Sequence, residues 1–358
     1  MLVSARHKIN IPVKKILVIQ LGDIGDVVWA IPSFWALKAA FPQSDVSVLV
    51  RNHNGDFLSD DSHIDKIFTV TTESAFSGLQ LLRNLRREKF DLLFDLRADD
   101  RGAFLSFLSG AKMRAAMYFP SLPWRNRAFT HLVDPLPAKV KKLGAAEQSL
   151  KIIRGLGIEE TTSIPQIFVA EKMRDKMSKL LIEENIETGN RWVSINPFSR
   201  WSYKEWGIDK WRQLAFFIRQ TYNMPVIITG SAAEKKRAAE LAAESHSSIH
   251  NLAGKTTLRE MAALLQMSSL HIGVDSAAPH IAAAVGTPTI TIYGPSDWRD
   301  WAPTGDQNMV VEPDMDCSPC RKKGCEGKGR SICLDDLPVA KVQKAVETML
   351  SNSVFGKD

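Results

Sequence analysis

Polar residues stand in the sequence where an apolar strand gives way to a helix of small residues. The stretch at 270–297, LHIGVDSAAPHIAAAVGTPTITIYGPSD, is typical of a strand, a helix and a second strand, and Asp275, Ser276 and His280 fall at the first strand-to-helix junction. Ligands of parallel sheets bind outside the carboxyl ends of the strands, and a helix N-terminus presents free N–H groups to an anion. We expect Asp275 to accept a hydrogen bond from a ligand hydroxyl, and the amides of Ser276 and Ala277 to hold a phosphate. The alternative is that Asp275 or Ser276 only caps the helix.

Hydrogen-bond donors and small residues follow other expected strand ends in the second half of the chain. Together with the 275–280 cluster they form the binding set that we expect: Asn196, Ser199, Arg200, Lys204, Gly230, Ser231, Glu234, Gly254, Lys255 and Thr256. Such a set suits a nucleoside diphosphate. No Asp-x-Asp follows a strand in this half, so no divalent metal is expected. Lys204 and helix N–H groups would stabilise the charge on the leaving group instead.

The first half of the chain carries carboxylates at corresponding places. The run KILVIQLGDIGDVVWAIP predicts a strand at 15–20 and a tight turn into a helix, with Asp23 and Asp26 in the turn. The turn contains glycines, but it has neither the G-x-G-x-x-G pattern nor the Gly-Lys-Ser/Thr of a phosphate-binding loop. A carboxylate held at such a turn is a candidate general base, and we assign this role to Asp26. The alternative is that Asp26 caps the helix.

Charged residues also follow the strand expected at 90–96, at the same edge of the sheet as Asp26. The residues that could meet an acceptor are Asp23, Arg97, Asp100 and Arg101, with Asp99 beside them. A cleft between the two halves would place a carboxylate base opposite a bound phosphate. That arrangement suits the transfer of a group from a nucleotide to a hydroxyl acceptor.

Four cysteines occur within one short basic segment, at Cys317, Cys320, Cys325 and Cys333. A CxxC pair followed by two further cysteines is compatible with a zinc or iron–sulfur site. The spacing differs from the paired CxxC of a zinc ribbon, and the cytoplasmic location expected below argues against disulfides. We therefore favour reduced thiols that pack locally, and expect no bound metal.

Apolar runs alternate with helix-like segments along the whole chain, which predicts parallel, doubly wound sheets. Strands are expected at 15–20, 46–50, 65–70, 90–96, 112–117, 192–196, 226–230, 251–256 (with its turn), 270–274 and 289–293. Helices are expected at 27–40, 79–89, 104–108, 146–156, 171–184, 208–222, 231–244, 258–266, 278–285 and 338–350. Residues 120–127, rich in Pro, Trp and Arg, are expected to form a loop.

Length and composition suit two α/β domains. The chain has 358 residues, 44% of them hydrophobic, and a shift in composition at 159–165 is the expected linker. The expected domains are 1–165 and 166–336, each Rossmann-like, followed by a C-terminal helix in 337–358. The net charge is +6, with basic groups at Arg83–Arg87, Arg125–Arg127, Lys139–Lys142 and Arg321–Arg330.

This positive surface suits acidic small molecules, phosphorylated lipid headgroups or nucleic acid, although a solvated basic face is the alternative. No run of about 18 apolar residues is present, so no transmembrane helix is expected. The first residues show neither the apolar region nor the cleavage site of a secretory signal. We therefore expect a cytoplasmic protein.

Five stretches together resemble glycosyltransferase family 9, the ADP-heptose:lipopolysaccharide heptosyltransferases. They are ILVIQLGDIGDVVWAIPSFWALK, NPFSRWSYKEWGIDKW, VIITGSAAE, NLAGKTTLREMAALL and GVDSAAPHIAAAVGTPTITIYGPSD. The cysteine segment, CSPCRKKGCEGKGRSICLDDL, looks like the tail of the heptosyltransferase III subgroup. The resemblance implies a GT-B fold, in which two Rossmann-like domains face each other across a cleft.

The resemblance also implies roles for single residues. Asp26 matches the general base that deprotonates the acceptor hydroxyl, and Lys204 matches the lysine on the donor phosphates. Asp275 matches the aspartate that contacts the donor sugar or ribose, and the phosphate and sugar neighbourhood is matched by Ser276, Ala277 and His280. Family members often carry Thr-Gly after this aspartate. The Ser-Ala of this chain keeps the N–H groups but disfavours the positive φ that glycine allows.

The implied reaction is an inverting, metal-independent transfer of heptose from ADP-L-glycero-D-manno-heptose, without a cofactor. The implied acceptor is a heptose of the phosphorylated lipid A–core oligosaccharide. It would be reached by surface contact at the cytoplasmic face of the inner membrane, and no nucleic acid is expected as a partner. The N-terminal domain would bind the acceptor, and the C-terminal domain the nucleotide sugar.

Two other functions fit the same residues. One is an enzyme of the same fold that uses another nucleotide sugar, such as a UDP-sugar transferase or an epimerase. The other is a non-catalytic module that binds a nucleotide or a sugar. A pure binding module has no need of a base, so Asp26 favours an enzyme.

Overall fold

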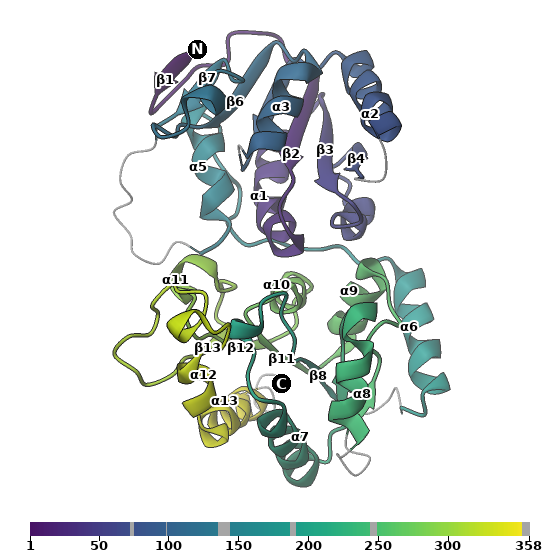
Figure 1. Cartoon of the computed structure of the whole chain (residues 1–358). Coiled ribbons are helices and arrows are strands. Elements are labelled where there is room, and N and C mark those ends of the chain that lie inside the picture. The colour runs from purple at the N-terminus through teal and green to yellow at the C-terminus, as the bar shows by residue number, and fades with distance from the viewer. Residues whose placement is uncertain (72–74, 98, 135–143, 187–190, 244–248, 353–358) are drawn as a thin grey trace. The chain divides into compact units, whose positions relative to one another are not determined.

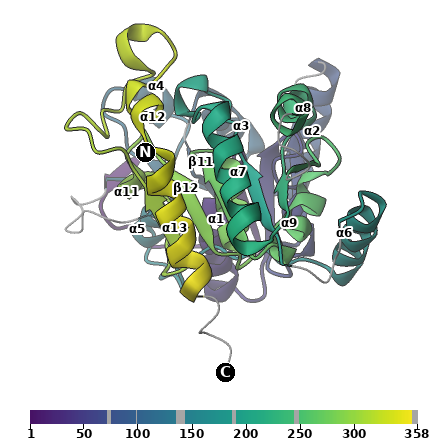
Figure 2. The same ribbon diagram turned by 90° about the horizontal axis from the view of Figure 1, so that it is seen from below.

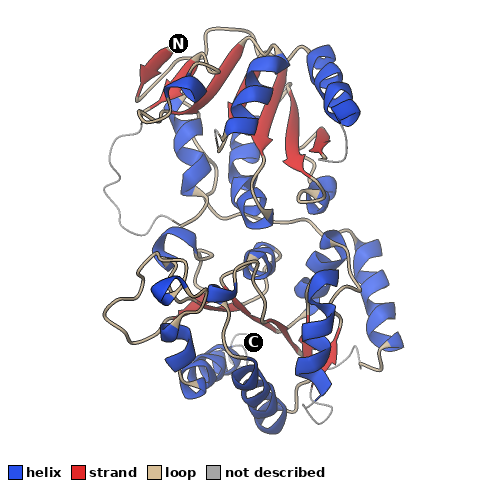
Figure 3. Ribbon diagram, viewed as in Figure 1, coloured by secondary structure: helices blue, strands red, loops and turns tan. Residues whose placement is uncertain are grey.

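The computed structural model describes residues 1–71, 75–97, 99–134, 144–186, 191–243 and 249–352. The chain divides into two compact units, Met1–Phe168 and Val169–Asp358, each with its own sheet and helices (Figures 1 and 3). All strand pairings found in the described residues are parallel, as expected from the alternating pattern. The basic run Lys139–Lys142 lies outside the described residues.

The first unit contains a seven-stranded sheet in the order β1-β7-β6-β5-β2-β3-β4. Its strands are β1 (Leu2–Ser4), β2 (Lys15–Gln20), β3 (Asp45–Arg51), β4 (Lys66–Val70), β5 (Leu92–Asp95), β6 (Met113–Met117) and β7 (His131–Val133). Residues 16–20 of β2 are all buried, which is typical of a parallel strand with helices on both faces. The carboxyl end of this central strand is therefore buried, and the turn that carries Asp23 and Asp26 follows it directly.

The helices of the first unit are α1 (Ile24–Ala40), α2 (Ala75–Glu88), α3 (Asp100–Ser109), α4 (Pro123–Asn126) and α5 (Glu147–Gly155). Helix α1 packs against α5, whereas α3 packs between α2 and α4. The expected start of α1 near Val27 was three residues too late. The helix begins at Ile24 because Asp23 and Asp26 form a capping box at its first turn. Pro32 lies well inside α1.

The second unit contains a six-stranded sheet in the order β10-β9-β8-β11-β12-β13. Its strands are β8 (Val193–Asn196), β9 (Val226–Ile228), β10 (Ile249–Asn251), β11 (Leu270–Val274), β12 (Thr289–Ile292) and β13 (Asn308–Val311). The chain adds strands outward from β8 in one direction and then returns to its other side with β11. The strand order therefore reverses between β8 and β11, which is where open α/β sheets bind ligands.

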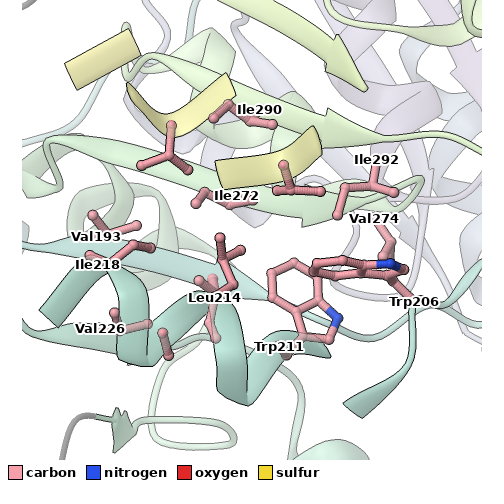
Figure 4. Close-up of a cluster of buried hydrophobic side chains, with 14 of the residues drawn as sticks. Val193, Trp206, Trp211, Leu214, Ile218, Val226, Ile272, Val274, Ile290 and Ile292 are labelled. Atoms are coloured by element: carbon pink, nitrogen blue, oxygen red, sulfur yellow. The ribbon is translucent and has the colours of Figure 1, made fainter. Parts of the chain in front are cut away.

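Helices cover both faces of this second sheet. They are α6 (Glu171–Glu183), α7 (Ile208–Tyr222), α8 (Lys235–Ala243), α9 (Leu258–Met267), α10 (Ala277–Ala284), α11 (Trp298–Trp301), α12 (Ile332–Asp336) and α13 (Val339–Asn352). Helices α7 and α13 lie side by side (Figure 2). Trp206 and Trp211 meet edge to face, 5.3 Å apart, among buried aliphatic side chains of the sheet such as Ile272 and Val274 (Figure 4). This packing holds the strand ends in place.

Several sequence expectations were wrong at short elements. The expected loop at 120–127 contains the single-turn helix α4, which Pro123 starts because its fixed φ suits a first helical position. Within the short strand and turn predicted at 251–256, the strand ends already at Asn251, and the chain turns from Leu252 onward. The sequence analysis missed β1, β7 and β13, which have three or four residues each and so show too little periodicity. No helix among the described residues is long and apolar enough to cross a membrane.

Candidate functional site

The turn after β2 folds the carboxylate of Asp26 back over the backbone. Its Oδ2 accepts a hydrogen bond from the N–H of Asp23 at 2.8 Å and lies 2.6 Å from Nη1 of Arg97. Both bonds go to Oδ2, so neither of them uses Oδ1. A Cβ on Gly22 would lie 2.2 Å from Oδ2, and a glycine is therefore required for this approach. Asp26 is thus a capping residue that also pairs with an arginine from another strand end.

Gln20 is a polar residue of this turn that the sequence analysis missed. Its side-chain amide donates to the carbonyl of Asp26 at 3.2 Å and accepts from the N–H of Gly22 at 3.1 Å. Gln20 is buried and ends an otherwise apolar strand, and this change of polarity is the signal that could have identified it. Its two hydrogen bonds hold both sides of the turn that carries Asp26.

Burial is the largest influence on the proton affinity of Asp26. Its side chain keeps 22% of its surface exposed, and desolvation raises its pKa above the ordinary aspartate value. The positive charge of Arg97 and the N–H of Asp23 act in the opposite direction without cancelling the increase. A raised pKa makes a carboxylate a better proton acceptor, provided that it is still ionised at the working pH.

The structure brings only part of the expected acceptor set to this turn. Asp23 pairs with Arg51 at the end of β3, and Arg97 reaches Asp26. Asp100 pairs with Arg125 instead, and Arg101 donates to the carbonyl of Thr71 at 3.3 Å. Asp99 caps α3 through the N–H of Gly102. The cluster at the turn therefore consists of Asp23, Asp26, Arg51 and Arg97, and Asp99 also contacts it, because its Oδ2 lies 3.7 Å from Nε of Arg97.

A second cluster lies where the strand order of the other sheet reverses. Asn196 ends β8 and is paired in register with Gly273 of β11. The hydroxyl of Ser276 donates to Oδ1 of Asn196 at 3.2 Å, and that of Ser199 donates to the carbonyl of Asp275 at 3.2 Å. Ser276 is the N-cap residue of α10, but its side chain makes no capping bond to the helix. The hydroxyl of Ser276 therefore does not cap the first N–H groups of α10.

Lys204 and Asp275 form an ion pair at this second cluster. Nζ of Lys204, in a short turn between β8 and α7, lies 2.6 Å from Oδ2 of Asp275. Asp275 is the more buried of the two, with 11% of its side chain exposed against 22% for Lys204. Each partner compensates the charge of the other. A phosphate that arrives here would meet both the ammonium group and the N-terminus of α10.

Two buried aromatic rings lie close to the charge of Asp275. Burial lowers the pKa of His280 to about 4, so its imidazole is neutral at physiological pH. Tyr293, which directly follows β12, is fully buried, and burial together with the charge of Asp275 raises its pKa. No hydrogen-bond partner is found for its hydroxyl within the described chain. The sequence analysis missed Tyr293, although a tyrosine after the apolar TITI strand is a usable signal.

The remaining residues of the expected nucleotide site lie in two turns, one after β9 and one after β10. Glu234 accepts from the N–H of Ser231 at 2.6 Å, so these two residues cap the next helical turn. Gly254 has a φ of +76°, and its N–H donates to the carbonyl of Gly230 at 2.9 Å. Lys255 does not join them, because its ammonium group pairs with Glu184, the residue after α6. The turn after β9 is compact, and its carboxylate is already engaged as a cap.

The cysteine segment packs against the loop after β12 and the loop between β8 and α7. Ser318 donates to the carbonyl of Gly294 at 2.9 Å, and Ser331 to that of Tyr203 at 2.6 Å. All four cysteines are unpaired, and burial raises the pKa of Cys333 to about 11, with a contribution from the three neighbouring thiols. Within the described residues, no group of three or more His, Cys, Asp and Glu side chains is placed to hold a metal ion.

Comparisons with known proteins identify the family. Residues 79–330 match the family model of Glycosyltransferase family 9 (heptosyltransferase). Lipopolysaccharide heptosyltransferase 3 of Escherichia coli (strain K12) is 28% identical over 291 residues, which cover 77% of this chain and 82% of that protein.

Solved structures agree on the fold. The family 9 glycosyl transferase of Veillonella parvula DSM 2008 superposes with a TM-score of 0.81 at 21% identity, covering 95% of this chain and 97% of that one. E. coli heptosyltransferase WaaC with ADP-2-deoxy-2-fluoro heptose gives a TM-score of 0.70 at 18% identity, covering 93% and 99%. The two Rossmann-like units are thus those of the GT-B fold, and the expected fold class is confirmed. The chain belongs to glycosyltransferase family 9, the heptosyltransferases.

Proposed function

We propose that the protein transfers heptose from ADP-L-glycero-D-manno-heptose to a heptose of the lipopolysaccharide inner core, with inversion and without a metal ion. The second unit binds the donor, and the first unit binds the acceptor. The observation that carries the proposal is the ion pair of Lys204 and Asp275 at the point where the strand order reverses. The names of the E. coli relatives, a lipopolysaccharide heptosyltransferase and a heptosyltransferase with an ADP-heptose analogue, support the choice of donor and acceptor.

When the donor binds, its contacts with Lys204 and Asp275 would replace the ion pair between these two residues. Lys204 turns from Asp275 to the diphosphate, and the uncapped N–H groups of α10 bind the same oxygens. Asp275 is then released to accept a hydrogen bond from a hydroxyl of the sugar or ribose. Preorganised donors of this kind stabilise the charge that develops on the departing ADP, which is the role that a metal ion has in other transferases.

The acceptor would be activated by Asp26. As the acceptor oxygen bonds to the anomeric carbon of the heptose, its proton passes to the carboxylate of Asp26. The bond from the anomeric carbon to the diphosphate oxygen breaks, and its electron pair leaves with ADP. Attack from the side opposite to the leaving group inverts the anomeric centre. The raised pKa of Asp26 supports this assignment, because it favours uptake of the proton.

The acceptor is anchored in a membrane by its lipid A part, and we propose that the protein reaches it at the cytoplasmic face of the inner membrane. The arginines beside the acidic turn, Arg51 and Arg97, suit the phosphates of the core oligosaccharide. A phosphate that draws Arg97 from Asp26 would also remove the positive charge that lowers the pKa of the base.

Calorimetric titration tests the donor site directly. Purified protein is titrated with ADP, ADP-heptose, UDP and GDP in the presence of EDTA, and we expect binding of the two adenine ligands only. Preference for UDP or GDP would move the function to another nucleotide sugar, and silence with all four would favour a non-catalytic protein. A transfer assay with purified core acceptor, analysed by NMR for the anomeric configuration, tests inversion.

A further inference from the structure

An aromatic surface of the first unit remains exposed on α3 and the segment around α4. It consists of Phe104, Phe107, Phe119 and Trp124, which keep 61%, 58%, 37% and 53% of their surface in solvent. On α3, residues such as Ala103 and Leu105 are buried, whereas Phe104 and Phe107 are neighbours on the outer side of the same helix. A group of exposed aromatic side chains is typical of a surface that binds a protein, a membrane or a ligand.

Contacts within the unit hold the aromatic surface together. Helices α3 and α4 pack against each other, and Arg125 joins them, because its guanidinium pairs with Asp100 and lies 5.6 Å from the ring of Trp124. Asn126 donates to the carbonyl of Phe119 at 2.9 Å, which fixes the segment before α4. The rings are therefore presented on an ordered base.

Exposed arginines lie on the elements next to these rings. Arg83 and Arg87 are exposed on α2, which lies beside α3 (Figure 1), and Arg127 is exposed directly after α4. No ion pair is found for Arg83, Arg87 or Arg127 in the part of the chain that the structure describes. Asp100, the acidic residue at the start of α3, is already neutralised by Arg125. The surface thus combines apolar rings with uncompensated positive charge.

We propose that this aromatic surface binds an anionic lipid bilayer. Aromatic rings favour the membrane–water interface, and arginines beside them bind lipid phosphates. Phe104, Phe107 and Trp124 enter the headgroup region, while Arg83, Arg87 and Arg127 lie on the phosphates. The inference rests on the proposed function in one respect, since it supplies the contact that a membrane-anchored acceptor requires.

A second copy of the chain fits this surface less well. A two-fold interface would place the same patch on both partners, so the arginines of one copy would face those of the other. An anionic bilayer supplies the opposite charge over the whole surface. Charge complementarity therefore selects the lipid.

Vesicle sedimentation tests the proposal with the full-length protein. We expect binding to vesicles of phosphatidylcholine mixed with phosphatidylglycerol, weaker binding at high salt, and little binding to phosphatidylcholine alone. The double variant Phe104→Ser/Phe107→Ser should reduce partitioning by roughly tenfold or more. The variant Arg83→Gln/Arg87→Gln/Arg127→Gln should reduce it by roughly fivefold for each arginine.

The matched control is Phe216→Ser, because Phe216 on α7 of the second unit is exposed to a similar extent, at 54%. Equal binding by Phe216→Ser and by Phe104→Ser/Phe107→Ser, or no binding by the unaltered protein, would overturn the proposal. A dimer that dissociates on dilution, and that Phe104→Ser/Phe107→Ser abolishes, would also overturn the proposal. This result would assign the surface to a second copy of the chain. Unfolding transitions of all variants should coincide, because the substituted side chains are exposed.

Failure of the proposed function can be separated from failure of this surface. Transfer is measured with acceptor embedded in vesicles and with delipidated core oligosaccharide. We expect Phe104→Ser/Phe107→Ser to lose transfer on vesicles but to keep it on the soluble acceptor. If the unaltered protein transfers to neither acceptor yet binds anionic vesicles through these residues, the proposed function fails and the surface stands. Equal loss on both acceptors would contradict the surface.

Discussion

Each of the two units contains a glycine followed by a helix-capping carboxylate, but the surroundings of the two carboxylates differ. In the first, Gly22 and Asp23 precede Asp26, whose carboxylate accepts the N–H of Asp23 at 2.8 Å. In the second, Gly230 and Ser231 precede Glu234, whose carboxylate accepts the N–H of Ser231 at 2.6 Å. In both cases the glycine makes room for the carboxylate.

The difference lies in the third partner. Asp26 also binds Arg97, which comes from the end of another strand, and burial raises its pKa. The longer side chain of Glu234 caps the start of its own helical turn by accepting the N–H of Ser231. A capping carboxylate therefore becomes a candidate base when burial in the tertiary structure raises its pKa, although the cation beside it acts in the opposite direction. The cap and the base are therefore separable roles of one side chain.

The largest expected effect is that of Asp26→Asn. The amide oxygen can still accept the N–H of Asp23, so the cap survives, but the proton acceptor is lost. We expect turnover to fall by roughly 10² to 10⁴, with ADP affinity within a few-fold of the unaltered protein. Asp26→Ala should lose the same turnover and, in addition, about 1 kcal/mol of unfolding free energy. Kinetic assays and urea unfolding measure both, and retained turnover in Asp26→Asn would reduce Asp26 to a cap.

The variant Lys204→Ala tests the donor site of the second unit. Loss of a charge-assisted contact to the diphosphate should weaken ADP binding by roughly 10- to 100-fold. Lys179→Ala is the matched control, since Lys179 lies exposed on α6. Calorimetry measures both variants. Unchanged ADP affinity in Lys204→Ala would remove this lysine from the phosphate site.

The two glycines can be compared by substitution with alanine. At Gly22 a Cβ would lie 2.2 Å from Oδ2 and 2.5 Å from Cβ of Asp26, so the whole side chain must move. At Gly230 the nearest atom is the terminal Oε2 of Glu234 at 2.9 Å, which a longer side chain can shift. We expect Gly22→Ala to cost about 1–3 kcal/mol and Gly230→Ala less. Chemical unfolding of both variants measures the difference, and the reverse order would contradict the steric argument.

The third partner is tested by the pH dependence of Arg97→Gln. Arg97 favours the ionised form of Asp26, so its removal should raise the pKa of Asp26 further. The base acts when it is deprotonated, and the acid side of the kcat/KM profile should therefore move to higher pH. A profile that stays in place would show that Arg97 does not influence the base.

The smallest effect is expected at the cysteines. We expect protein purified under reducing conditions to contain zinc and iron well below one per chain, and EDTA to leave transfer unchanged. A thiol reagent should react with exposed Cys317 first and with Cys333 last, because Cys333 is buried and its pKa is raised to about 11. Metal near one per chain would replace our interpretation with a metal site.

Local patterns in the sequence were sufficient for much of the fold. The apolar runs at β2 and β11 and the helix after Asp275 were recognisable, because burial on both faces of a parallel strand imposes an uninterrupted apolar run. The glycine–aspartate turn was equally visible, since its cap joins residues three positions apart. The resemblance to family 9 also followed from such contiguous stretches, and the comparisons confirm it.

Partners distant in the sequence were decided by the tertiary structure alone. Arg97 reaches Asp26 across 71 positions, and Ser276 reaches Asn196 across 80, because parallel pairing of β2 with β5 and of β8 with β11 aligns their carboxyl ends. The tertiary structure likewise pairs Lys255 with Glu184, 71 positions away, rather than with the second cluster. Spacing along the chain carries no information about strand order. It therefore indicated which residues could act, whereas the sheets determined which of them meet.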